Sequence, residues 1–173
     1  MPDARRILYR RERRVSVDEI QRPRREVWII HPHGQPAPSS VPEEVQVLLL
    51  DGSWSESSAM AREVTGWGRL VSLPMTGESR YWLRAKQEGS RFSTAEALLF
   101  LLDSFRLEAA SAALRLQFEL HVYASLRARG QKQRAEEFLE TSPLRGAFPE
   151  MLAHLNTSRS REARRPPSEP TRQ

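Results

Sequence analysis

The chain has 173 residues, which suits one domain with appendages, and it contains no cysteine, which excludes disulfides, Cys-ligated zinc and thiol catalysis. Its 27 basic and 22 acidic residues give a formal net charge of +5, and every basic residue except Lys86 and Lys132 is arginine. No run of apolar residues is long enough to predict a membrane span, and the absence of cysteine is compatible with a cytoplasmic protein.

Residues 1–26 are rich in arginine and contain few acidic residues. Arginine forks onto phosphate and stacks on bases, so this segment suits a basic arm that follows a phosphate backbone. The alternative is a solvated, partly disordered leader, and a GC-rich genome explains the excess of arginine over lysine equally well. The predicted organisation is an arm over 1–26, an α/β domain over 27–142, and a short helix with a disordered basic tail over 143–173.

Short apolar runs predict strands at residues 27–31 and 46–50. Prolines and glycines between them predict a loop over 32–42. The second run is bounded by turn residues, so it predicts a strand buried on both faces of its sheet. A third run at 70–73, closed by Pro74, completes a strand–helix–strand unit and therefore predicts a parallel sheet.

Asp51 lies between the second strand and a predicted helix. Ser53 and Glu56 have the spacing of a capping box, which starts a helix that runs to about Val64. A carboxylate at the end of a parallel strand lies where open α/β sheets bind ligands, so Asp51 is the best candidate for a general base or a ligand anchor. From spacing alone, an Asp that closes a turn on its own backbone is the more frequent case. Trp54 suits either stacking on a base or packing in the core.

Arginine alternates with aromatic and aliphatic residues over 80–84, which predicts a short extended piece. This pattern suits either a nucleic-acid contact or a solvated strand face. Ser93 and Glu96 repeat the capping-box spacing and predict the start of a deeply buried helix. The capping role explains these two residues fully, so taken alone they give a weak signal for ligand binding.

The C-terminal part is predicted to be mainly helical. Helical periodicity continues over 108–129 and ends at Gly130. Residues 131–140 predict a charged helix or loop, and apolar residues from Phe148 to Leu155 predict a last short helix. From residue 156 the composition predicts a disordered tail.

Three segments, in this order and spacing, resemble the signatures of the DTW-domain family: Asp51-Gly52-Ser53-Trp54, Tyr81-Trp82-Leu83-Arg84 and Ser93-Thr94-Ala95-Glu96-Ala97. The first matches the Asp-x-Thr-Trp motif for which the family is named, and the resemblance covers roughly residues 27–130. It implies a SPOUT-like α/β fold, with a mainly parallel sheet flanked by helices and a knotted region that holds S-adenosylmethionine.

The resemblance also implies a reaction. The 3-amino-3-carboxypropyl group of S-adenosylmethionine, as co-substrate, is transferred to N3 of a uridine in tRNA, and methylthioadenosine is released. At the matching positions Asp51 is implied as the base. The residues implied on the substrate side are Ser53, Trp54 and Arg84, and those on the cofactor side are Ser93, Thr94 and Glu96. The reaction needs no metal, so the lack of cysteine and the scarcity of histidine agree with it.

The sequence departs from the family pattern in three respects. Ser53 replaces the usual threonine, which keeps the hydroxyl and loses a methyl group. Many members begin with a cysteine cluster suited to zinc, which this chain lacks. The first strand of longer members, with the loop after it, is missing or degenerate in residues 1–26. Two alternatives therefore stay open, a noncatalytic RNA-binding relative and the same transfer to ribosomal RNA.

Overall fold

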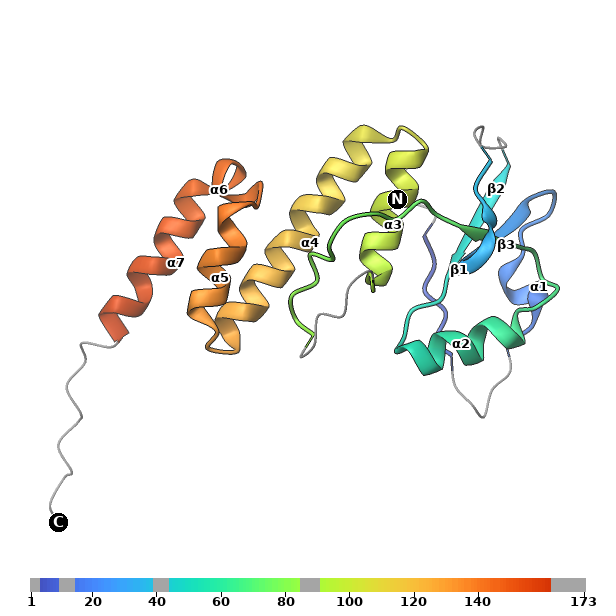
Figure 1. Cartoon of the computed structure of the whole chain (residues 1–173), viewed down its shortest axis with the longest axis horizontal. Coiled ribbons are helices and arrows are strands. Elements are labelled where there is room, and N and C mark those ends of the chain that lie inside the picture. The colour runs from blue at the N-terminus through green and yellow to red at the C-terminus, as the bar shows by residue number, and fades with distance from the viewer. Residues whose placement is uncertain (1–3, 10–14, 39–43, 85–90, 163–173) are drawn as a thin grey trace, which may run out of the picture. The chain divides into compact units, whose positions relative to one another are not determined.

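The structure is a computed structural model (Figure 1) that describes residues 4–9, 15–38, 44–84 and 91–162, with the backbone alone for Trp54 and for 156–162. Its contacts divide the chain into two compact units. The first unit comprises residues 1–77 and 92–106, and the second comprises 78–91 and 107–173. These boundaries differ from the predicted division, which kept 27–142 together. Among the described helices, none is long and apolar enough to cross a membrane.

The first unit is α/β, as predicted. In chain order its elements are α1 (Val17–Ile20), β1 (Glu26–Pro36), β2 (Val45–Leu49), α2 (Trp54–Glu63), β3 (Arg69–Ser72) and α3 (Thr94–Ser104). The strands form one parallel sheet in the order β2-β1-β3, which confirms the predicted parallel arrangement. The SPOUT-like knot stays a prediction.

The central strand of the sheet is β1, not β2. Val27, Trp28 and Ile29 of β1 are buried, whereas every residue of β2 is only half-buried. The prediction that β2 is buried on both faces is therefore wrong, because β2 lies at an edge of the sheet. A run of apolar residues predicts a buried strand. It does not specify which strands pair with it, and these partners decide the order of the strands in the sheet.

Helices contribute to the cores on both faces of β1. Val27 and Ile29 pack with Val64, the residue that caps the C-terminus of α2. Side chains alternate along a strand, so Trp28 points to the opposite face. There its ring meets Phe105, at the end of α3, edge-on at 6.0 Å between ring centroids. The first half of β1 is thus packed on both of its faces.

The described residues of the predicted basic arm are anchored to the first unit. The Tyr9 hydroxyl donates to Glu63 Oε1 at 2.8 Å. The side chain of Gln46 on β2 holds the segment after α1, because its Nε2 donates to the Ile20 carbonyl at 2.7 Å and its Oε1 accepts from the Arg22 amide at 2.9 Å. This part of the chain therefore contributes to the fold, and its contact with phosphate stays a prediction.

β1 is longer than predicted, because its pairing resumes after a bulge. Ile30 and Gln35 both pair with Val71, so residues 31–34 lie outside the regular ladder. Pro32 lies in this bulge, where the N–H that proline lacks is not required. The prediction of a loop over 32–42 is therefore wrong for residues 32–36, which belong to β1. Residues 39–42 of the predicted loop lie outside the described residues.

Replacing Gly34 is expected to destabilise the first unit. A Cβ atom at Gly34 would lie 2.5 Å from backbone atoms of Val71, which belongs to the neighbouring strand and cannot move aside. We expect Gly34→Ala to lower the free energy of unfolding by about 3 kcal/mol. Gly146→Ala is the matched control, since a Cβ there meets nothing within 4 Å. Urea unfolding followed by circular dichroism measures both, and equal midpoints for the two variants would contradict the close approach.

The second unit is helical. Its helices are α4 (Glu108–Ala128), α5 (Lys132–Glu140), α6 (Leu144–Ala147) and α7 (Pro149–Glu162). α4 ends at Ala128, and Gly130, two residues further on, has a φ of +76°, which confirms the predicted glycine stop. The predicted last helix exists, but it continues to Glu162. The prediction of a disordered tail from residue 156 is therefore wrong over residues 156–162. Residues 163–173 of that tail lie outside the described residues.

The core of the second unit includes residues from α4, α5 and α6. Buried side chains recur along one face of α4 at spacings of three and four residues, and Val122, Tyr123 and Leu126 are fully covered. Phe138 of α5 and Leu144 of α6 are also fully buried. These helices lie on both sides of the predicted boundary at 142/143.

Candidate functional site

Asp51 lies in the short turn between β2 and α2, with its side chain exposed. Two sets of hydrogen bonds fix this turn. The Ser53 amide and hydroxyl both donate to Glu56 Oε2, at 2.8 and 2.6 Å, which confirms the predicted capping box. The Ser57 hydroxyl reaches back to the carbonyls of Leu50 and Gly52, at 3.3 and 3.4 Å. The backbone on both sides of Asp51 is therefore tied to the first turns of α2.

Thr94, the first residue of α3, lies beside Asp51. Its hydroxyl donates to Asp51 Oδ1 at 2.8 Å, although 43 residues separate the two in sequence. Serine and glutamate position Thr94 through the second capping box. The Ser93 amide donates to Glu96 Oε2 at 2.6 Å, the Ser93 hydroxyl donates to the same oxygen at 2.8 Å, and Glu96 is buried. Ser93 and Glu96 therefore bond each other and orient the start of α3.

Two helix N-termini meet at this carboxylate. α2 begins at Trp54, directly after the turn that carries Asp51, and α3 begins at its hydrogen-bond partner Thr94. A helix N-terminus carries partial positive charge from its aligned peptide dipoles. The start of these helices therefore suits an anionic group of a ligand.

Gly52 belongs to the first family signature, and Ser57 is a site residue that sequence reasoning missed. A Cβ on Gly52 would lie 3.0 Å from Glu56 Cβ and 3.3 Å from the Met60 methyl carbon, so the turn packs closely against α2. The D-G pair already marked a turn, and that was the available signal for Gly52. Ser57 gave no such signal, because a serine inside a polar helix normally faces solvent.

The segment 80–84 forms a turn in the second unit, so the prediction of an extended piece is wrong. The Trp82 amide donates to the Arg80 carbonyl at 2.9 Å. Arg84, predicted on the substrate side, donates to the carbonyl of Arg91 and lies 5.5 Å from the centre of the Tyr81 ring. The first unit holds the other predicted site residues, and the side chain of Trp54 lies outside the description.

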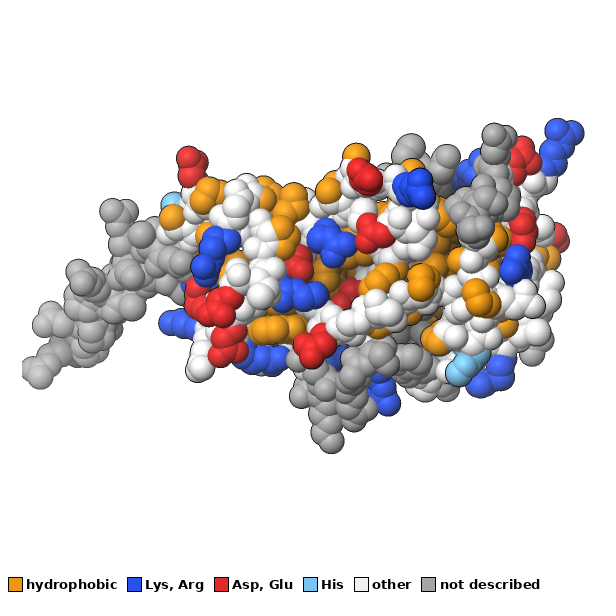
Figure 2. Space-filling view, turned by 45° about the horizontal axis from the view of Figure 1, so that its top comes forward, with side chains coloured by type: hydrophobic (Ala, Val, Ile, Leu, Met, Phe, Trp, Pro, Cys, Tyr) orange, Lys and Arg blue, Asp and Glu red, His pale blue; other side chains and the backbone are white. Residues whose placement is uncertain are grey.

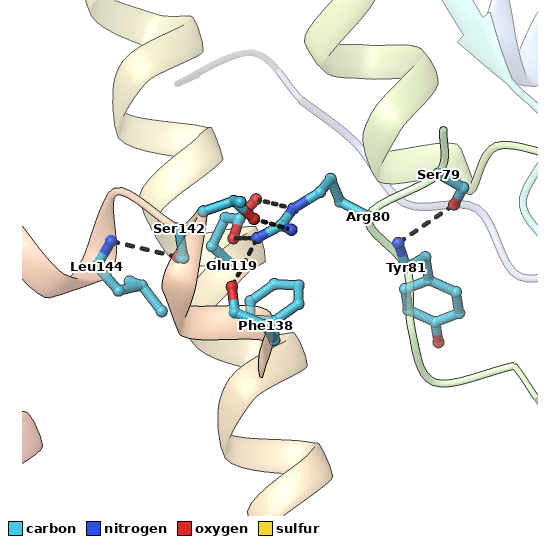
Figure 3. Close-up of polar contacts among 8 residues, drawn as sticks. Ser79, Arg80, Tyr81, Glu119, Phe138, Ser142 and Leu144 are labelled. Atoms are coloured by element: carbon cyan, nitrogen blue, oxygen red, sulfur yellow. Dashed lines mark hydrogen bonds and ion pairs between the residues drawn. The ribbon is translucent and has the colours of Figure 1, made fainter. Parts of the chain in front are cut away.

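Arg80 ties this segment to the helices of the second unit. Its guanidinium points into the α4–α5 pair, as Figure 3 shows, and makes a two-pronged ion pair with Glu119 at 2.7 and 3.0 Å. It also donates to the Phe138 carbonyl at 3.1 Å and lies 4.0 Å from the centre of that ring. The alternation of arginine and aromatic residues therefore serves internal packing at Arg80, and neither a nucleic-acid contact nor a solvated strand face describes this residue.

Two arginines of the helical part hold the same turn. Arg129 donates to the Leu83 carbonyl at 2.8 Å, and Arg134 donates to the Trp82 carbonyl at 3.1 Å. Nothing in the sequence near either arginine indicated these bonds, since their acceptors are backbone groups 46 and 52 residues away. The arginine excess is thus partly structural.

On the face drawn in Figure 2, basic and acidic side chains are interspersed over the helices of the second unit. Arg127, for example, pairs with Glu136 at 3.2 Å. A net positive charge spread in this way does not define a continuous phosphate track on that face.

Residues 2–127 match the model of a family described as the DTW domain. The match begins at residue 2, so it includes the segment that sequence reasoning set apart as an arm. No curated protein and no solved structure matches the chain.

Proposed function

The chain belongs to the DTW-domain family, and on that premise we propose that it transfers the 3-amino-3-carboxypropyl group of S-adenosylmethionine to N3 of a uridine in cytoplasmic tRNA. Methylthioadenosine is the second product. The observation that best supports this proposal is the Thr94–Asp51 hydrogen bond. It joins two separate family signatures at one exposed carboxylate, which is what a shared site requires.

Asp51 has the chemistry of the base. N3 of uridine carries a proton that must leave before its electron pair can form a bond to carbon. In the proposed step this proton passes to a carboxylate oxygen of Asp51, and solvent later removes it. Thr94 donates to Oδ1, which fixes the orientation of the carboxylate and leaves Oδ2 to face the base.

The residues around Asp51 fit the co-substrate. When bound, S-adenosylmethionine supplies an alkyl carbon activated by positively charged sulfur, and the electrons of the broken carbon–sulfur bond stay on sulfur. Its amino-acid part carries a carboxylate, which suits the two helix N-termini, and an exposed Asp51 suits a cationic neighbour. Thr94 is proposed on this side, with Ser93 and Glu96 holding it in place. Ser53 and Trp54 stay proposed for the uridine side, and a role for Arg84, which belongs to the second unit, stays a prediction.

The proposal is tested by incubating the full chain with S-adenosylmethionine and unmodified tRNA. We expect methylthioadenosine to appear by liquid chromatography, and mass spectrometry to find the added group on uridine. Reactions without RNA, and with ribosomal RNA in place of tRNA, are the controls.

Each other outcome identifies a different alternative. Release with ribosomal RNA alone would move the reaction to that substrate. Calorimetric binding of tRNA without binding of S-adenosylmethionine and without release would replace the transferase by a noncatalytic RNA-binding relative.

A further inference from the structure

The net positive charge of the chain lies in the second unit. Residues 78–91 and 107–173 contain 15 basic and 10 acidic residues, whereas the first unit contains 12 of each. The arginine-rich segment 1–26 is therefore balanced by acidic residues of its own unit. Long-range attraction of a polyanion to this protein comes from the helical unit instead.

Cations of the second unit gather where α4 meets α5. The two helices form an antiparallel pair with a short connection at one end (Figure 1). We call residues 127–134 the α4–α5 corner. It contains no acidic residue, and its cations are Arg127, Arg129, Lys132 and Arg134. Arg127 pairs with Glu136, but within the described residues the other three cations form no ion pair with a carboxylate. The corner therefore carries uncompensated positive charge.

Two of these cations are held in place by uncharged partners. Arg129 donates to the Leu83 carbonyl at 2.8 Å, and Arg134 donates to the carbonyl of the preceding residue, Trp82, at 3.1 Å. Both guanidiniums thus bind one turn of backbone and keep their full charge. An arginine that is already ordered gives up less side-chain freedom when it binds an anion.

Helix stability does not explain the cations at the start of α5. Lys132 is the first residue of this helix, and the first turn contains no acidic residue. A helix N-terminus carries partial positive charge, so a cation in the first turn is unfavourable there. Lys132 is exposed, and the part of the chain that the structure describes gives its ammonium no hydrogen bond or ion pair. Its charge is therefore available to a partner.

The backbone of an RNA suits this surface better than a membrane does. Guanidinium matches two oxygens of a phosphate, and an ammonium adds a point charge beside it. Binding to a lipid surface also needs apolar side chains that enter the bilayer interface. None of the large exposed apolar side chains in the described residues belongs to the corner. The group of cations is compact, so it suits a few neighbouring phosphates and not a long track.

We propose that the α4–α5 corner binds phosphates of the RNA substrate through Arg129 and Lys132. The identity of this RNA rests on the proposed function. The family match ends at residue 127, so both cations lie beyond it. A second contact on the same RNA raises its affinity without touching the reacting atoms. Loss of the corner should therefore raise KM for tRNA and leave kcat unchanged.

The test measures binding of unmodified tRNA to the full chain at several salt concentrations. We expect Lys132→Met to make the slope of log K against log salt shallower by about 0.7 to 0.9, the value for one phosphate contact. Lys132→Met combined with Arg129→Met should double this change and weaken binding at low salt by about tenfold. Arg129→Lys keeps the charge and should keep the slope. Because Arg129 also holds the turn, the single Lys132→Met variant decides the outcome.

Arg145→Met is the matched control. Arg145 is an exposed cation of α6, which follows the far end of α5, a helix of nine residues and therefore about 14 Å long. This variant removes the same charge from the same unit and should keep the slope of the wild type. Thermal melts show that each variant is folded.

Two results would overturn the proposal. One is an equal slope for Lys132→Met and Arg145→Met, even if the wild type releases methylthioadenosine. The other is that the double variant keeps its tRNA binding but loses binding to phosphatidylserine vesicles, which would make the corner a membrane contact. If tRNA binding depends on Lys132 but the wild type releases no methylthioadenosine, the corner stands and the proposed transfer fails.

Discussion

Asp51→Asn is expected to lower the rate of methylthioadenosine release at saturating tRNA by about 100-fold or more. Asparagine has the size of aspartate and can still accept from the Thr94 hydroxyl, but it cannot take up a proton at neutral pH. Binding of S-adenosylmethionine and of tRNA should stay close to that of the wild type. Single-turnover assays and calorimetry measure the two effects separately.

Two further substitutions show whether the hydrogen bond matters as well as the carboxylate. Thr94→Val removes the hydroxyl and should cost about tenfold in rate, whereas Thr94→Ser keeps it and should be nearly neutral. Asp103→Asn is a charge-matched control near the other end of α3, a helix of 11 residues and therefore about 16 Å long. If Asp51→Asn turned over as fast as Asp103→Asn, Asp51 would not be the base.

Arg80→Met is expected to destabilise the second unit by about 3 kcal/mol. The side chain of Glu119 is only 5% exposed, so losing its partner leaves a buried charge without compensation. Arg80 is 25% exposed and also holds the turn to the Phe138 carbonyl, which adds to the loss. Urea unfolding of the wild type and the variant, followed by circular dichroism, measures the difference.

A double substitution and an exposed pair control this experiment. Arg80→Met combined with Glu119→Leu removes both charges and should recover most of the lost stability. Glu136→Gln breaks the pair with Arg127, in which the Glu136 side chain is 52% exposed, and should cost less than about 1 kcal/mol. An Arg80→Met variant as stable as Glu136→Gln would show that the Arg80–Glu119 contact contributes little.

Local signals in the sequence gave the helix starts correctly. Both capping boxes form at the predicted residues, because a box is completed within four neighbouring positions. Glycine at 130 ended α4 for the same reason, since its positive φ depends on no distant contact. The three apolar runs likewise gave three strands, and the parallel arrangement followed from their spacing.

Features set by distant partners were not accessible in the same way. β1 rather than β2 is central because two strands pair with it. Arg80 in the 80–84 segment binds Glu119, 39 residues further along the chain, and no local pattern indicated this partner. The candidate site shows both cases. The residues next to Asp51 in sequence indicated a turn residue. Only the family resemblance linked Asp51 to Ser93-Thr94, and the structure shows the link as a hydrogen bond from Thr94 to Asp51.

The order in which the two units use the chain has a consequence for their assembly during synthesis. Residues 78–91 belong to the second unit but precede α3, which belongs to the first. A nascent chain that ends at Gly77 has Asp51 and all three strands, yet it lacks Thr94, and a fragment that starts at Leu107 has Glu119 but lacks Arg80. No single cut releases both units whole. The carboxylate site therefore forms only after the first segment of the other unit has left the ribosome, and cleavage within 78–91 separates each unit from part of itself.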